Sequence, residues 1–86
     1  MSDAMPVRVM VTDVWDEFDF ALPSGTPVGE LKRQALHRGH VTRDPAGYLV
    51  KYRGAVLADE GQSLSDHGVV SNAALIVLPR RRRPVR

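Results

Sequence analysis

The side chains that most often perform catalysis are few in this chain of 86 residues, and their spacing forms no catalytic pattern. His37, His40 and His67 have no serine or paired carboxylates near them at a spacing typical of a triad or a metal site. Cysteine is absent, which excludes a thiol nucleophile, a thiolate metal site and a disulfide framework. We therefore expect no enzyme and no cofactor or metal ion, and we interpret the three histidines as structural or surface residues.

Binding chemistry is better represented, beginning with the one tryptophan. Trp15 lies in a short polar stretch beside Asp13, Asp16 and Glu17. A loop tryptophan can anchor a protein interface, because large aromatic side chains dominate interface energetics. It can equally fold back onto the edge of its own domain. Both interpretations stay open.

The C-terminal stretch "PRRRRPVR" concentrates positive charge. Residues 1–79 carry seven cationic and ten anionic side chains, a net of −3, and the last seven residues carry five arginines, which together give the net charge of +2. The chain is thus a mildly acidic body with a basic appendage. The tail arginines are Arg80, Arg81, Arg82, Arg83 and Arg86.

Three interpretations of this tail compete. Its arginines can make bidentate contacts in an acidic groove of a partner protein, and Pro79 and Pro84 favour an extended, accessible segment. A nucleic-acid arm is the second, but the tail has no aromatic residue to stack on bases and the body repels phosphate. A solvated end without a specific role is the third.

Hydrophobic periodicity predicts the elements that must position these residues. "VRVMV" and "FDFAL" alternate and are joined by a short polar link, which predicts an antiparallel hairpin. In "TPVGELKRQALHRG" the pattern predicts a helix of about ten to twelve residues, with Thr26 as the N-cap, Pro27 at the first helical position and Gly39 in the left-handed C-cap position. Ser63 is predicted to cap a single helical turn.

The remaining apolar stretches predict further strands. "YLVKYRG" places Tyr48, Val50 and Tyr52 on one face and Leu49 and Lys51 on the other, so one row must face the helix and part of the other should form an exposed contact surface. "AVL" predicts a short edge strand, and "NAALIVL", the most apolar stretch, predicts a final strand in the middle of the sheet.

The order ββαββ, a short helical turn and β indicates an α+β domain with a mixed sheet of four to five strands and one helix across one face. With the motifs "LPSGTPVGELK", "YLVKYRGAVL", "SLSDHGV" and "ALIVL", it resembles the ubiquitin-like β-grasp family over about residues 7 to 80. The most specific motif is Leu64–Ser65–Asp66, which in the family caps the short helical turn. We expect a flexible N-terminus at residues 1–6, the domain at 7–79 and an extended basic tail at 80–86.

Departures from the family shape the functional expectation. The chain has no glycine after Gly68, so it lacks the family's terminal Gly-Gly, and its only lysines are Lys32 and Lys51. The resemblance places Lys51 where ubiquitin's binding face has its central isoleucine, and Leu78 where that face has a valine. We expect protein partners to contact Leu49, Lys51, Leu78 and Trp15 together with the arginine tail.

Two roles follow from the resemblance. The first is a bacterial protein modifier, recognised by an adenylating enzyme or a protease and activated or trimmed at a terminus without Gly-Gly. The second is a non-covalent adaptor or assembly subunit, like the YukD-type proteins associated with specialised secretion. No stretch is long enough to span a membrane and the N-terminus lacks the regions of a secretion signal, so we expect a cytoplasmic protein, and a monomer.

Overall fold

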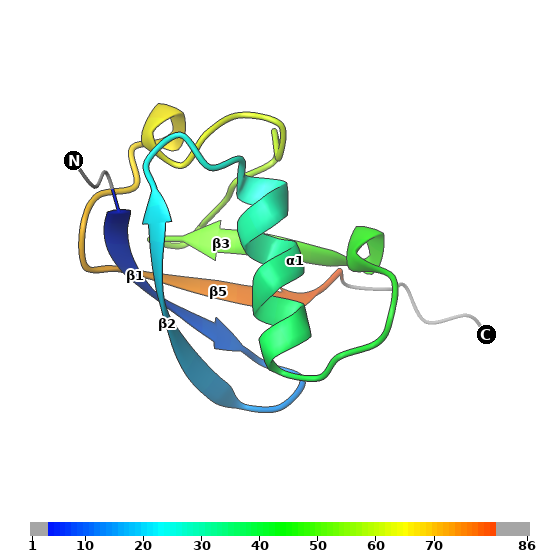
Figure 1. Cartoon of the computed structure of the whole chain (residues 1–86). Helices are drawn as coiled ribbons and strands as arrows, with labels where there is room; N and C mark the ends of the chain where they lie inside the picture. Colours follow the sequence, from blue (N-terminus) through cyan, green and yellow to red (C-terminus); the bar gives the residue numbers. More distant parts are fainter. Residues whose placement is uncertain (1–3, 81–86) are drawn as a thin grey trace.

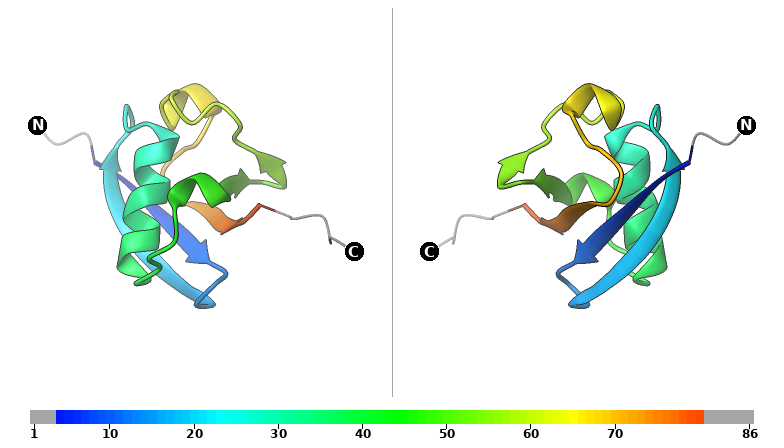
Figure 2. Two further views of the ribbon diagram at one scale, coloured as in Figure 1. Left: turned by 90° about the vertical axis from the view of Figure 1, so that its right-hand side faces the viewer. Right: turned by 90° about the vertical axis from the view of Figure 1, so that its left-hand side faces the viewer.

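The computed structural model describes residues 4–80 and arranges them in two layers (Figure 1). The strands are β1 (Ala4–Val11), β2 (Asp16–Pro23), β3 (Tyr48–Tyr52), β4 (Ala55–Val56) and β5 (Ala73–Pro79), and the helix is α1 (Val28–Arg38). Two single turns of 3-10 helix, η1 (Pro45–Gly47) and η2 (Ser65–His67), complete the fold. This is the element order that the sequence predicts. Figure 2 shows α1 on one side of the sheet.

The five strands form one mixed sheet in the order β2-β1-β5-β3-β4. β1 pairs antiparallel with β2 and parallel with β5, and β3 pairs antiparallel with both β5 and β4. Parallel neighbours need a long crossover, which α1 and the segments after it supply. The predictions of a central final strand and a short edge strand at β4 are confirmed.

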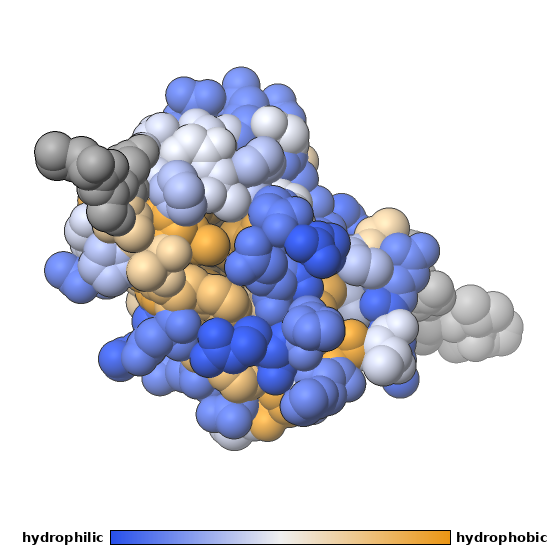
Figure 3. All heavy atoms as spheres, in the orientation of Figure 1, coloured by the Kyte–Doolittle hydropathy of each residue, from blue (hydrophilic) through white to orange (hydrophobic). Residues whose placement is uncertain are grey.

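One hydrophobic core lies between the sheet and α1. Its members come from alternate positions of the strands and from one face of the helix, and the most deeply buried include Val9, Val11, Leu31, Val50, Leu64 and Val77. The outer surface of α1 is hydrophilic, and apolar surface lies beside it over the β1–β2 hairpin (Figure 3). The helix therefore covers the sheet with a single apolar stripe.

β1 begins three residues earlier than the predicted start of the domain. Ala4, Met5 and Pro6 pair with β2, so they are part of the sheet rather than of a flexible N-terminus. Pairing with β5 starts only at Val7, so this end of β1 has a neighbour on one side and proline is tolerated there. Met5 is 7 % exposed and extends the inward-facing alternation by one position.

The predicted N-cap of α1 is wrong by one residue. Pro27 occupies the N-cap position, and no side chain caps the helix. Instead, the loop before η2 supplies the acceptors: the Val28 N–H donates to the Gln62 carbonyl at 3.0 Å and the Gly29 N–H to the Glu60 carbonyl at 2.9 Å. Because distant backbone satisfies these donors, Thr26 has no capping role.

The end of α1 also differs from the prediction. Gly39 has a φ of −84°, and the left-handed residue is His40, with a φ of 60°. The His40 N–H donates to the His37 carbonyl and the Val41 N–H to the Leu36 carbonyl, which is the Schellman pattern. Space is tight at Gly39 instead, because a Cβ there would lie 3.3 Å from the Val14 Cγ2.

The turn at η2 follows the sequence prediction. The Ser63 hydroxyl accepts a hydrogen bond from the Asp66 N–H at 3.1 Å, so Ser63 caps this turn as predicted. Leu64 and Val69 on either side of it are buried. Within residues 4–80, no helix is long and apolar enough to cross a membrane.

Candidate functional site: the open face of the sheet

The candidate site is the face of the sheet opposite α1, which we call the open face. On β3, Tyr48 and Val50 point into the core, so Leu49 and Lys51 point outward and are partly exposed. This decides which of the two predicted rows faces the helix. On β5, Leu78 lies directly opposite Leu49, so the structure brings these two predicted contact residues together beside Lys51.

The strand register aligns side chains in a row across all five strands of the open face. Met10 lies opposite Glu17 on one side and Ile76 on the other, and Lys51 lies between Ile76 and Val56. We call Glu17, Met10, Ile76, Lys51 and Val56 the central row. Ile76 is 41 % and Val56 45 % exposed, so the central row places apolar surface in contact with water on both sides of Lys51.

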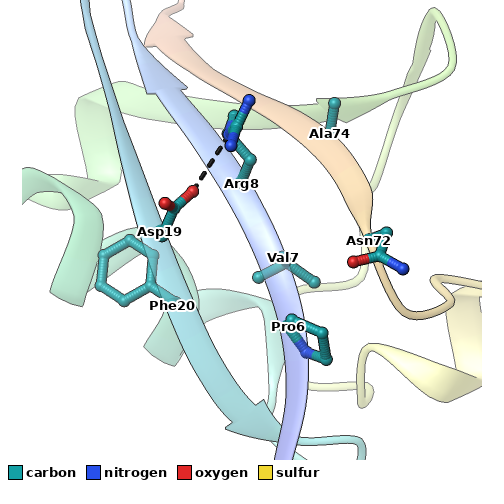
Figure 4. A pocket seen from close by; sticks show the side chains of 7 residues that line it. All are labelled: Pro6, Val7, Arg8, Asp19, Phe20, Asn72 and Ala74. Atoms are coloured by element: carbon teal, nitrogen blue, oxygen red, sulfur yellow. Dashed lines mark hydrogen bonds and ion pairs between the residues drawn. The ribbon is translucent and has the colours of Figure 1, made fainter.

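The two cationic side chains of the open face, Arg8 and Lys51, differ in whether they form an ion pair. Arg8 donates to Asp19 at 3.0 Å, and this hydrogen bond raises the pKa of Arg8 (Figure 4). No carboxylate within the described part of the chain pairs with Lys51. The open face therefore presents one ammonium group, not engaged in an ion pair, among aliphatic side chains.

A hollow of about 480 Å³ lies on the same face, toward β2. Figure 4 shows it between the Arg8–Asp19 pair and Asn72, with Pro6 and Ala74 among its lining residues. Ala74 lies in register with Arg8, and its small side chain leaves the space open. The open face is thus aliphatic around Lys51 and hollowed, with polar walls, beside it.

The two lysines of the chain differ sharply in accessibility. Lys32 is 4 % exposed, and its Nζ donates to the Tyr48 carbonyl at 3.0 Å and pairs with the Glu60 Oε1 at 2.7 Å. Lys51 is partly exposed on the central row. Only Lys51 therefore offers a reachable side-chain amine.

We predict that an amine-acetylating reagent such as sulfosuccinimidyl acetate modifies Lys51 and spares Lys32. The reaction needs a free neutral amine, and Lys32 must first leave its ion pair through local opening, so it should react roughly tenfold more slowly or less. Peptide mass spectrometry over a time course measures both rates. Equal rates at the two lysines would contradict the burial of Lys32, and labelling in denaturant, where both should react, is the control.

The other predicted contact residues lie outside the strands. Trp15 is in the turn between β1 and β2, and its side chain is 75 % exposed, so it does not fold back onto the sheet edge. Arg80 continues the pairing of β5 past Pro79: its N–H donates to the Gly47 carbonyl at 2.8 Å and its Nε to the Ala46 carbonyl at 2.9 Å. The predicted free tail therefore does not include Arg80. Arg81, Arg82, Arg83 and Arg86 lie outside the described residues.

Sequence reasoning missed four members of the central row, namely Glu17, Met10, Val56 and Ile76. The signal for Ile76 was present, because the alternation in "AALIVLP" places it on the same face as Leu78. Met10 and Val56 could not be joined to it from the sequence, since strand order and register decide which side chains become neighbours.

The three histidines do not come together in one site. His67 is partly exposed, and its Nε2 is 2.8 Å from the Asp59 carbonyl, which agrees with a structural role for this histidine. His37 and His40 are exposed at the end of α1. No cluster of three or more metal-ligating side chains occurs between residues 4 and 80.

Comparison with known structures assigns the fold. The ubiquitin-like domain of an Arabidopsis thaliana protein superposes with a TM-score of 0.77 at 16 % identity, covering 99 % of this chain and 86 % of that one. Caldiarchaeum subterraneum ubiquitin gives 0.75 at 15 % identity, covering 94 % and 99 %. The UBL domain of Plasmodium falciparum Dsk2 gives 0.73 at 23 % identity, covering 90 % and 99 %. No protein-family model and no curated protein matches the sequence.

The chain therefore has the ubiquitin-like fold, an α+β fold with a five-stranded mixed sheet and one helix across it, as predicted. At these identities the likeness concerns the fold alone. The residues that carry a function must be argued from this chain's own surface.

Proposed function

We propose that this chain is a protein-docking domain whose open face binds a partner presenting an aliphatic surface with a carboxylate at its centre. The observation that carries this proposal is the central row, in which an unpaired Lys51 lies between the exposed Ile76 and Val56. The aliphatic side chains supply affinity because binding removes their surface from water. The ammonium group supplies orientation, because a partner without a carboxylate there would leave it desolvated and unpaired.

The same features disfavour other partners. Among the outward-facing residues of β1 and β2, Asp19 and Glu17 outnumber Arg8, so this side of the open face has no excess of positive charge to attract phosphate. The tail arginines remain a proposed second contact, for an acidic groove of the same partner. Arg80 supports this proposal, because its bonds to Gly47 and Ala46 direct where the chain leaves the sheet.

Lys51→Glu should weaken binding of the native partner by roughly 30-fold. Reversing a charge that is buried in an interface costs more binding free energy than reversing one at the rim. Lys51→Arg should keep most of the affinity. Arg33→Glu on the outer face of α1 changes the net charge equally and should bind within a factor of about two of the wild type. Affinity purification from the native host followed by calorimetry with the purified partner measures all three. Equal affinity of Lys51→Glu and wild type would reject the open face.

Two finer roles remain proposals: a non-covalent adaptor, and a modifier of the bacterial type activated or trimmed at a terminus without Gly-Gly. Intact-mass spectrometry of the protein from its native host separates the two. A free, untrimmed chain in a stable complex supports the adaptor, and covalent adducts or a trimmed C-terminus support the modifier.

A further inference from the structure

The turn between β1 and β2 carries a conformational anomaly. Trp15 has a φ of 55°, in the left-handed region where a Cβ is close to the following carbonyl oxygen. Of the four described residues other than glycine with positive φ, His40 and Asn72 are types that tolerate this region, whereas Trp15 and Arg53 are bulky outliers. Glycine or asparagine would form the same turn with less strain.

Within residues 4–80 little offsets this strain, since the Trp15 N–H donates to the Thr12 carbonyl at 3.2 Å, a turn hydrogen bond that glycine or asparagine would make as well. The Trp15 side chain is 75 % exposed, so its ring gains little from packing. The neighbouring Val14 is also 43 % exposed. Trp15 therefore lowers the stability of the domain in two ways, through its strained backbone and through the apolar surface that it exposes to water. Strained residues of this kind concentrate at functional sites.

Hydrogen bonds nevertheless fix the turn to the rest of the domain on the side before Trp15. The Thr12 N–H donates to the Val77 carbonyl at 3.1 Å, and the Tyr48 hydroxyl donates to Asp13. Burial, and then this bond to Asp13, raises the pKa of the Tyr48 hydroxyl, so it remains a donor. Val14 contacts the helix end at Gly39. Trp15 is therefore displayed from a preorganised turn, which lowers the entropic cost of binding through it.

The charges around the turn between β1 and β2 indicate which kind of partner Trp15 binds. Residues 4–23 contain one cation, Arg8, which pairs with Asp19, and Asp16 and Glu17 directly after Trp15 are exposed. The nearest helix end brings Arg38, but its guanidinium lies over the rings of Phe18 and Phe20, at 5.3 and 5.1 Å. A tryptophan followed by two exposed carboxylates, neither of them in an ion pair among the described residues, is disfavoured at anionic lipid and at nucleic acid.

From these observations we infer that Trp15 is a second, preorganised anchor, which inserts into an apolar pocket rimmed by Lys or Arg on a protein partner. This goes beyond the open face, since it rests on the strain, exposure and charge of the turn and not on the central row. Tryptophan is one of the residues that most often dominate an interface when a partner buries it in a well-packed pocket that excludes water.

The test begins with stability. Trp15→Asn should raise the Tm by about 5 °C, because asparagine accepts a positive φ and leaves no exposed ring. Trp15→Phe keeps both the strain and an aromatic side chain, so its Tm should stay within about 2 °C of the wild type. An unchanged or lower Tm for Trp15→Asn would show that the ring is packing after all and would overturn the proposal.

The second part identifies and measures the partner. A photoreactive aromatic amino acid at position 15, expressed in the native host, should crosslink to one protein, and that purified protein should bind Trp15→Asn at least tenfold more weakly than wild type and Trp15→Phe within a few-fold. Trp15 fluorescence should shift to shorter wavelength on binding. No specific crosslink, or equal affinity of Trp15→Asn, would overturn the proposal, as would a fluorescence shift with phosphatidylcholine or phosphatidylglycerol vesicles.

Lys51→Glu in the same titration keeps the two sites distinguishable. If Trp15→Asn weakens binding and Lys51→Glu does not, the Trp15 anchor is supported and the open face is rejected as a binding site. The reverse result rejects only the Trp15 anchor. The affinity of wild type for the partner should also fall with added salt, because the rim contacts are ionic.

Discussion

Leu31→Ala is expected to lower the free energy of unfolding by about 2 to 5 kcal/mol. Leu31 is fully buried on the face of α1 that covers the sheet, so its truncation removes transfer free energy and leaves a cavity under the helix. In a domain of this size, each kcal/mol lowers the Tm by roughly 4 to 8 °C. The change should therefore be large in both urea and thermal unfolding, with an unchanged m-value.

Val70→Ala is the matched control for Leu31→Ala. Val70 is 60 % exposed, so its truncation should change stability by no more than about 0.5 kcal/mol. A loss below about 1 kcal/mol for Leu31→Ala would contradict the position of α1 across the sheet.

Lys32→Met should cost about 1 to 3 kcal/mol, although it keeps a side chain of similar length. The substitution leaves the Tyr48 carbonyl without its donor and the Glu60 carboxylate, 24 % exposed, without its partner. These two acceptors belong to β3 and to the loop before η2, so Lys32 joins α1 to both. Chemical unfolding measures the loss.

The double variant Lys32→Met/Glu60→Gln separates the lost ion pair from lost packing. Removing both charges leaves no unpaired carboxylate, so the double variant should recover about 1 kcal/mol relative to Lys32→Met. A double variant no more stable than the single one would place the whole effect in the Tyr48 hydrogen bond and in packing. A Lys32→Met protein as stable as wild type would show that the buried ammonium contributes nothing.

Much of the fold was predictable because its signals are local. Alternation in "VRVMV" and "FDFAL" reports which side chains share a strand face, and the i, i+3, i+7 spacing of Val28, Leu31 and Ala35 reports the buried stripe of α1. Each pattern depends only on residues a few positions apart. The predicted hairpin, helix, Ser63 cap and central final strand are accordingly confirmed.

The errors share one physical cause, which is contact with segments that are distant in the sequence. Thr26 has the right type and place for an N-cap, but the Gln62 and Glu60 carbonyls, more than 30 residues away, accept the first helical N–H groups. Gly39 has the right type for a left-handed cap, but close contact with Val14 gives it another role, and His40 takes that conformation. Arg80 was predicted to leave the domain freely, and the Gly47 carbonyl extends the sheet to it.

The sequence by itself determined the order and type of the elements, the buried stripe of the helix and the placement of Leu49 and Lys51 on one strand face. Those properties follow from the periods of the helix and the strand, which are local. Only the tertiary structure decided that Met10, Ile76, Lys51 and Val56 form one row, that Lys32 is buried while Lys51 is not, and that Trp15 is strained and exposed. Strand register and long-range hydrogen bonds join residues far apart in the chain, and no local pattern encodes those pairings.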